Sequence, residues 1–194
     1  MINIVLKSKS PRRFDLLTDL GYKFIVDAKD VDETFDKNLS PYENVRNLAL
    51  KKVLVDREKY DNYIQIGCDT IVVLDNKVYG KPIDKNDAFY MLKSLSGKAH
   101  VVMSGLAIIY KEEIYNIVEE SLVFFKKLTD KEIWDYIETG ECFGKAGAYA
   151  IQGIGRNLVD HYEGSFNNIV GLPTEKVEEI LGEINGMEDK GRNN

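Results

Sequence analysis

The stretch MINIVLKSKSPRRFDLLTDLG, residues 1–21, decides how this chain begins to fold. Apolar residues at position 2 and at positions 4–6 are typical of a short β-strand. Pro11 suits the first turn of a helix, and Ser10 is then the predicted N-cap. Apolar side chains recur at helical spacing between residues 14 and 20, and Gly21 is suited to end the helix. The first 21 residues therefore predict a strand followed at once by a helix.

The segment SKSPRR, residues 8–13, lies between that strand and that helix. A helix N-terminus presents backbone N–H groups and the positive end of the helix dipole, which together favour an anion such as phosphate. Arg12 and Arg13 add planar guanidiniums that bind phosphate oxygens in pairs. The alternative is a serine cap followed by two solvated arginines, and the six residues by themselves leave both interpretations open.

The composition limits the class of protein. A chain of 194 residues with 44% hydrophobic content suits one domain, or at most two small lobes. A net charge of -6 argues against a broad nucleic-acid surface. No apolar run is long enough to span a membrane, and residue 1 leads straight into a strand, so we expect neither an export signal nor a membrane anchor. The two cysteines show no CxxC spacing, which favours a reducing cytoplasm without a disulfide or zinc site.

Strands and helices alternate along the rest of the chain, without repeats. Strands are predicted over 22–26 and 63–67, in a hairpin of 71–74 with 78–79, and in a long hairpin of 99–110 with 114–128. Helices are predicted to start after Ser40, Asp84 and Thr129 and at Thr174. A frayed polar tail is expected from residue 186 onward.

Asp69 and Thr70 are predicted to stand at the end of the buried strand that starts at residue 63. A carboxylate in such a place can serve as a general base or help to hold a divalent metal. Lys81, in the turn Gly80 to Pro82, can neutralise phosphate charge. The alternative is that Asp69 caps a turn and that Lys81 is a surface cation.

Glycine is concentrated between residues 140 and 155, a stretch that is too rich in glycine for an ordinary helix or strand. The backbone there must closely approach either a ligand or its own neighbours. The amide of Gln152 can donate and accept hydrogen bonds in one plane, which suits the edge of a nucleobase, although a loop glutamine is more often simply solvated.

Eight ordered motifs resemble those of the Maf-type nucleoside triphosphate pyrophosphatases, in the branch that acts on dTTP and UTP. The resemblance spans the chain up to the C-terminal tail. The motifs are SKSPRR (8–13), VDET (31–34), GCDTIVV (67–73), GKP (80–82), LSGKAHVVMSG (95–105), YIETGE (136–141), KAGAYAIQG (145–153) and GSFNNIVGLP (164–173).

The resemblance implies hydrolysis between the α- and β-phosphates, which yields a nucleoside monophosphate and pyrophosphate with the help of Mg²⁺ or Mn²⁺. It implies a catalytic set in which Asp69 is the proton acceptor and in which Glu33 and Asp69 face the metal. Arg12, Thr70 and Gln152 match the positions that distinguish the dTTP and UTP branch. By the same resemblance, the expected catalytic residues are Asp69, Glu33, Lys52 and Lys81, and the expected substrate-binding residues are Ser8, Ser10, Arg12, Arg13, Thr70 and Gln152.

The fold implied by the resemblance is α/β: a long, twisted, mixed β-sheet with flanking helices, in two lobes around a nucleotide cleft. Residues 1–186 would form one catalytic domain and residues 187–194 the tail. The family is commonly dimeric, so a cytoplasmic homodimer that binds a nucleoside triphosphate, but neither nucleic acid nor membrane, is expected. The chain departs from the family pattern at Lys7, Cys68, Cys142 and Gly144.

Two other functions remain open at this stage. A nucleotide-binding regulator of septum formation would not need a base, so the set of Asp69, Glu33, Lys52 and Lys81 argues against it. A pyrophosphatase for ITP or 7-methyl-GTP would differ at Arg12, Thr70 and Gln152.

Overall fold

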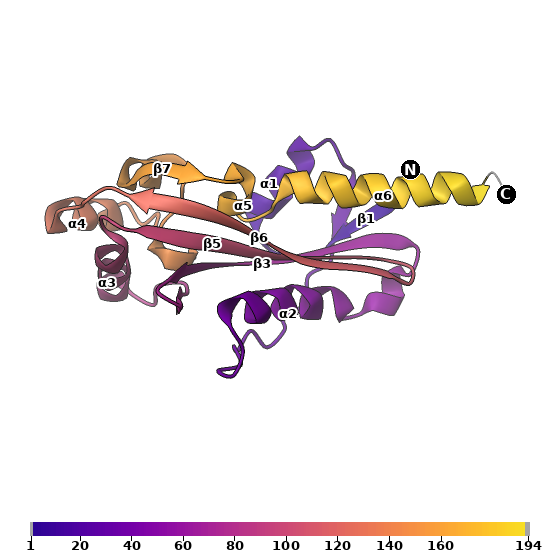
Figure 1. Cartoon of the computed structure of the whole chain (residues 1–194), viewed down its shortest axis with the longest axis horizontal. Helices are drawn as coiled ribbons and strands as arrows, with labels where there is room; N and C mark the ends of the chain where they lie inside the picture. The colour runs from indigo at the N-terminus through magenta and orange to yellow at the C-terminus, as the bar shows by residue number, and fades with distance from the viewer. Residues whose placement is uncertain (1, 193–194) are drawn as a thin grey trace. The chain divides into compact units, whose positions relative to one another are not determined.

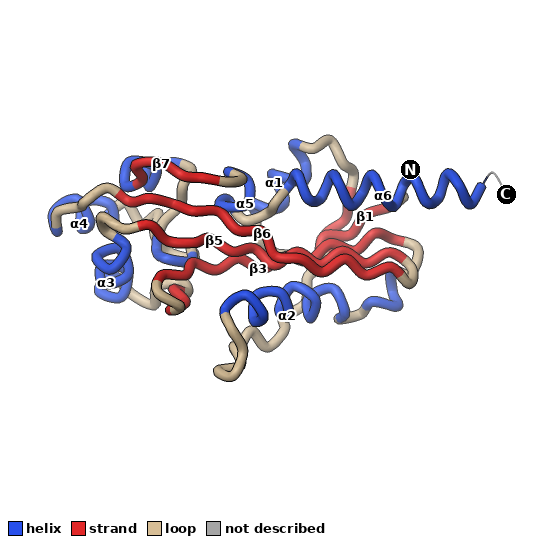
Figure 2. Tube along the Cα trace, viewed as in Figure 1, coloured by secondary structure: helices blue, strands red, loops and turns tan. Residues whose placement is uncertain are grey.

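The strand predicted at the start of the chain belongs to a seven-stranded mixed sheet. A computed structural model describes residues 2–192 of the chain. The strand order is β2-β1-β3-β5-β6-β7, and β4 also pairs with β3. Figure 2 draws the strands in red. The strands are β1 (Asn3–Leu6), β2 (Phe24–Val26), β3 (Tyr63–Leu74), β4 (Lys77–Tyr79), β5 (Ala99–Tyr110), β6 (Glu113–Phe125) and β7 (Val159–Glu163).

Three of the α-helices begin directly after caps that the sequence predicts. Ser40 and Thr129 each form a complete capping box with the glutamate three residues later, and Asp84 accepts a hydrogen bond from the N–H of Asp87. The α-helices are α1 (Pro11–Asp19), α2 (Pro41–Leu54), α3 (Lys85–Leu95), α4 (Asp130–Glu138), α5 (Phe166–Val170) and α6 (Thr174–Arg192). Short 3₁₀ helices are η1 (Arg57–Tyr60), η2 (Ala146–Ala148) and η3 (Gly153–Leu158). Among the described residues, no helix combines the length and apolar character that a membrane span requires.

The chain divides into two compact units. Unit 1 consists of residues 1–69, 104–119 and 171–194, and unit 2 consists of residues 70–103 and 120–170. Strands β3, β5 and β6 each contribute residues to both units. The predicted catalytic domain over 1–186 and the predicted nucleotide cleft stay predictions.

In unit 1, β1 lies between β2 and β3 and is parallel to both, with Ile4 opposite Phe24 and Ile64. Helix α2 covers one side of these strands, and α6 lies on the other side (Figure 1). Gly67 and Gly105 let α2 approach closely: a Cβ atom added at Gly67 would lie 2.5 Å from Val53 Cγ1, and one at Gly105 would lie 2.2 Å from the carbonyl oxygen of Val45. Ala49 of α2 is fully buried in the core that this approach creates.

Two features differ from the sequence prediction. β3 does not end at Asp69 but runs on to Leu74, because β3 lies inside the sheet between β1 and β5, and a central strand tolerates residues of low strand propensity. α6 continues to Arg192, past the expected start of the tail at Gly186, since each glycine costs a helix only about 1 kcal/mol. Residues 193 and 194 of the predicted tail lie outside the described part of the chain.

Candidate functional site

Lys52 joins two carboxylates in unit 1. Its Nζ lies 2.6 Å from Oδ1 of Asp69 and 2.8 Å from Oε1 of Glu33. The side chains of Lys52 and Asp69 are only 12% and 15% exposed, whereas that of Glu33 is 54% exposed. The structure therefore brings together three of the four predicted catalytic residues, with one ammonium between two carboxylates.

Each of these three residues is placed by its own element. Asp69 lies in the interior of β3 rather than at the strand end that the sequence predicted. Lys52 lies in the last turn of α2, which packs against Gly67 and Gly105 of the sheet. Glu33 lies in the loop before α2, and Lys51 donates to the carbonyl of Asp32 at 2.5 Å in the same loop. Successive lysines of α2 thus hold this loop against the helix.

The segment Ser8 to Arg13 follows β1 as predicted, and Ser10 is the N-cap residue of α1. Arg13 is buried, and its Nη1 donates to Oγ of Ser8 at 3.1 Å. The N–H of Ser10 also donates to Ser8 Oγ, at 3.3 Å. The hydroxyl of Ser8 is therefore the internal support of this loop. Arg12 is half-buried at the start of α1.

The carbonyl of Gly171 connects the loop to the strand that carries Asp69. This oxygen accepts a hydrogen bond from Nε of Arg13 at 2.7 Å and from Sγ of Cys68 at 3.3 Å. Since Cys68 directly precedes Asp69, the loop and the carboxylate cluster share one support within unit 1. The sequence by itself did not single out Gly171, although this glycine belongs to the motif 164–173. Its φ of 134° is one that residues with side chains rarely adopt.

Lys7, one of the departures from the family pattern, is accommodated by burial. Its Nζ donates to the carbonyl of Val55 at 3.3 Å and lies 4.5 Å from the centroid of the Tyr60 ring. Burial lowers the pKa of Lys7, while the nearby carboxylates of Asp27 and Asp56 act in the opposite direction. Cys142 is also buried, and burial raises the pKa of its thiol.

Unit 2 holds the remaining predicted residues, Thr70, Lys81 and Gln152. Thr70 is half-buried in β3, while Lys81 and Gln152 are exposed. The N–H of Gly147 donates to the carbonyl of Gly80 at 3.0 Å. This hydrogen bond ties the turn that carries Lys81 to the glycine-rich stretch that carries Gln152.

The backbone of the glycine-rich stretch closely approaches neighbouring parts of the protein, which is one of the two possibilities that the sequence left open. A Cβ atom at Gly147 would lie 3.0 Å from both methyl groups of Val72, and one at Gly155 would lie 2.2 Å from the carbonyl oxygen of Ala150. Gly144, another departure, has a φ of 74°, which favours glycine, and nothing lies within 4 Å of its added Cβ atom.

Polar side chains also hold this stretch, and the sequence by itself assigned no role to His100 of β5 or to Glu141. Nε2 of His100 lies 2.8 Å from Oη of Tyr149, and both residues are buried. Burial lowers the pKa of His100 to about 4 and raises that of Tyr149. Glu141 accepts two backbone hydrogen bonds from residues just beyond Gln152. The family motif YIETGE contains Glu141 but does not by itself indicate its partners.

Asp69 and Glu33 suit a divalent cation that also takes ligands from water or substrate. Among the described residues, no group of three or more histidine, cysteine, aspartate or glutamate side chains has the arrangement of a metal cage. The carboxylates of Asp69 and Glu33 nevertheless both contact the ammonium of Lys52, so the two oxygen donors already share one positively charged partner. Mg²⁺ is often bound by one or two carboxylates together with water and substrate phosphates. The donor set fits a cation of this type.

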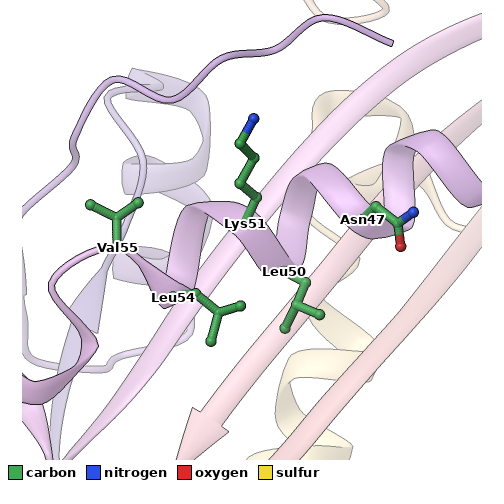
Figure 3. Close-up of a pocket in the computed structure, with 5 residues that line it drawn as sticks. All are labelled: Asn47, Leu50, Lys51, Leu54 and Val55. Atoms are coloured by element: carbon green, nitrogen blue, oxygen red, sulfur yellow. The ribbon is translucent and has the colours of Figure 1, made fainter. Parts of the chain in front are cut away.

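The pocket in Figure 3 is a separate feature of unit 1. It is lined by the end of α2 and the residue after it, with Lys51 directed away from Leu50 and Leu54. Of the described residues that line it, none belongs to the predicted catalytic or substrate-binding set. Its lining residues are Asn47, Leu50, Lys51, Leu54 and Val55.

Comparison with known proteins gives consistent matches over nearly the whole chain. The dTTP/UTP pyrophosphatase of Thermoanaerobacter sp. (strain X514) is 45% identical over 183 residues, which cover 93% of this chain and 95% of that protein. The proteins of the same name from Caldanaerobacter subterraneus subsp. tengcongensis and Caldicellulosiruptor saccharolyticus are 42% and 44% identical. The former match covers 98% of this chain and 93% of that protein, and the latter 95% and 96%.

A solved structure of a Vibrio cholerae protein aligns with a TM-score of 0.40 and 9% identity, over 72% of this chain and 78% of that chain. That likeness is too low to bear on fold or function. The family described as Maf-like protein matches residues 3–184. The site residues predicted from the sequence all fall within this range, and the chain belongs to the Maf family.

Proposed function

We propose that this protein hydrolyses dTTP and UTP to the nucleoside monophosphate and pyrophosphate. The observation that carries the proposal is the Glu33–Lys52–Asp69 cluster, in a Maf-family chain whose relatives bear the name dTTP/UTP pyrophosphatase. A carboxylate that is largely buried yet retains some access to solvent suits a proton acceptor for water.

Asp69 is the proposed proton acceptor. Lys52 donates a hydrogen bond to Oδ1 at 2.6 Å, which restrains the orientation of the carboxylate. A water molecule gives a proton to Asp69 while its oxygen forms a bond to the α-phosphorus. The bond from that phosphorus to the oxygen shared with the β-phosphate breaks, and pyrophosphate leaves with the electron pair. A positioned general base contributes about 10²- to 10⁴-fold in rate.

Glu33 and Asp69 would hold a divalent cation, Mg²⁺ or Mn²⁺, together with the substrate's phosphates. Such a cation supplies neutralisation of the charge that develops on the leaving group. Lys52 offsets the repulsion between the two carboxylates, which keeps them close enough to share one ligand.

The cationic and hydroxyl groups of the segments 8–13 and 80–82 would bind the triphosphate. Ser8 and Arg13 stabilise the segment 8–13 through their mutual hydrogen bond. Ser10 and Arg12 lie at the start of α1, where a helix favours negative charge. Lys81, which is exposed in unit 2, would add a further cation for the phosphates.

Arg12, Thr70 and Gln152 are the proposed specificity residues. The exposed amide of Gln152 can donate one hydrogen bond and accept another, as a pyrimidine edge requires. A site built for such pairs rejects ligands that leave its polar groups unpaired.

A turnover screen tests the reaction. Wild-type protein is incubated with dTTP, UTP, CTP, GTP, ITP and 7-methyl-GTP, with Mg²⁺ or Mn²⁺ and with a chelator, and the products are identified. We expect dTTP and UTP to be preferred, the monophosphate and pyrophosphate to be the products, and the chelator to abolish turnover. A nucleoside diphosphate with orthophosphate as primary products would refute the proposal.

Asp69→Asn tests the base, with Asp75→Asn as the matched control. Asp75 lies in the turn between β3 and β4 at a φ of 52°, a conformation that asparagine tolerates. We expect Asp69→Asn to fold and to lose about 10²-fold or more of the rate, whereas Asp75→Asn keeps it. Near-normal turnover by a folded Asp69→Asn protein would remove Asp69 from the mechanism.

We also propose that the protein acts as a homodimer in the cytoplasm. Light scattering at several protein concentrations checks the dimer, and a single species of monomer mass throughout would contradict it. Localisation of the full chain in cells by antibody checks the compartment.

A further inference from the structure

Glu141 caps a 3₁₀ helix to which it does not belong. Its Oε1 accepts a hydrogen bond from the N–H of Ile154 at 3.1 Å, and its Oε2 accepts one from the N–H of Gly155 at 2.7 Å. Ile154 and Gly155 are the second and third residues of η3. The first N–H groups of a helix have no partner within it, and a carboxylate is a strong acceptor for them.

Gln152 occupies the N-cap position of this same helix, with φ of -82° and ψ of 149°. An N-cap residue ordinarily uses its own side chain to accept from the first N–H groups. Within the described part of the chain, Gln152 makes no such side-chain cap. Because Glu141 performs the capping, the amide of Gln152 is not used for it.

Tyr136 binds the backbone that precedes Gln152. Its hydroxyl accepts a hydrogen bond from the N–H of Ala150 at 3.2 Å. Burial raises the pKa of Tyr136, and a hydrogen bond with Glu141 raises it further, so this hydroxyl stays protonated. Tyr136 and Glu141 are therefore one connected support that holds the backbone at residue 150 and at residues 154 and 155.

Gly153 provides the room that this support needs. A Cβ atom at this position would lie 2.3 Å from Oε1 of Glu141, and the φ of Gly153 is 76°. The backbone conformation favours glycine here, and a Cβ atom would displace the carboxylate. The residue directly after Gln152 is thus shaped around the carboxylate.

We infer that Glu141 is a positioning residue for substrate specificity: its carboxylate holds the loop so that Gln152 presents its amide to the nucleobase. The inference deepens the proposed function and rests on it, because it assumes that Gln152 reads the base. Glu141 itself does not touch the substrate. Its loss is expected to change which triphosphate is preferred rather than to lower every turnover equally.

The experiment compares Glu141→Gln and Glu141→Ala with the control Glu138→Gln. Glu138 ends α4, is exposed, and pairs with Lys85, so its carboxylate has a partner other than the N–H groups of η3. For each protein, kcat and KM are measured for dTTP, UTP and GTP, and hydrogen exchange is measured at the amides of Ile154 and Gly155. Glu141→Gln keeps the size of the side chain, so it remains informative if Glu141→Ala does not fold.

We expect faster exchange at both amides in the two Glu141 variants and a fall of about tenfold in the preference for dTTP over GTP, with Glu138→Gln unchanged. Equal losses for all substrates would show a merely structural role and overturn the inference. Unchanged preference, or unchanged exchange, would overturn it as well. If wild-type protein does not prefer dTTP and UTP, the proposed function fails instead, and that result is visible before any variant is made.

Discussion

Replacing Gly105 by alanine tests whether the close approach of α2 to the sheet builds the catalytic cluster. Gly105 lies in β5, and its backbone conformation is one that alanine can adopt. The added Cβ atom would lie 2.2 Å from the carbonyl oxygen of Val45 and 2.7 Å from its carbonyl carbon. Both atoms belong to the backbone of α2, so no side-chain rotation can relieve the contact.

The geometry sets the size of the effect. Ordinary contact between a carbon and an oxygen needs about 1 Å more than this separation, so helix and strand must move apart by about that amount. Overpacking a core in this way costs about 1–3 kcal/mol, and the rigid neighbour places this site toward the upper end. In a chain of this length, a loss of about 2–3 kcal/mol lowers Tm by roughly 5–10 °C.

The same shift displaces Lys52, two turns further along α2. Its Nζ lies 2.6 Å from Asp69, so a movement of about 1 Å breaks that hydrogen bond, and misplacement of this size can cost about 100-fold in rate. Calorimetry and the kcat for dTTP measure the two effects. Gly182→Ala in α6 is the control, because nothing lies within 4 Å of its added Cβ atom, and it should keep or raise Tm. A Tm of Gly105→Ala within about 1 °C of wild type would refute the reasoning.

Two further predictions concern unit 2. Because burial lowers the pKa of His100 from its ordinary value of 6.5 to about 4, the unfolded chain binds a proton between these values that the folded chain does not. The free energy of unfolding should therefore decrease by about 2 kcal/mol from pH 7 to pH 5. Urea titrations at several pH values measure this dependence, and His100→Gln should remove that part of it. An equal pH dependence in wild type and variant would show that His100 is not its source. Gln152→Glu replaces an amide donor with a charged acceptor, so kcat/KM for dTTP and UTP should fall by about tenfold or more while GTP is affected less; a uniform loss would restrict Gln152 to a role in the loop.

Much of the local structure was predictable because it depends on neighbours in the chain. The predicted helix starts after Ser40 and Thr129 are confirmed, and each is a capping box between residues only three apart. The turn between β3 and β4 places Asp75 and Asn76 at positive φ, as the predicted hairpin requires. The family resemblance, carried by motifs along the chain, was confirmed over residues 3–184.

Other features depend on partners that are distant in sequence, and local patterns carry no information about them. Asp69 was predicted to stand at the end of a strand, yet the neighbouring strands of the sheet keep β3 continuous to Leu74. The meeting of Lys52 with Glu33 and Asp69 requires α2 to lie against Gly67 and Gly105, a contact that no spacing rule reports.

The glycine-rich stretch shows the same division. Its composition by itself determined that it forms neither a long helix nor a long strand, because glycine carries a high conformational entropy cost in both. Which partner its backbone approaches was decided only by the tertiary structure, in which Glu141 lies beside Gly153 and accepts the N–H groups of the two residues that follow. A carboxylate can bind such a pair of N–H groups only when the packing of α4 and of the loop brings them within about 3 Å of it.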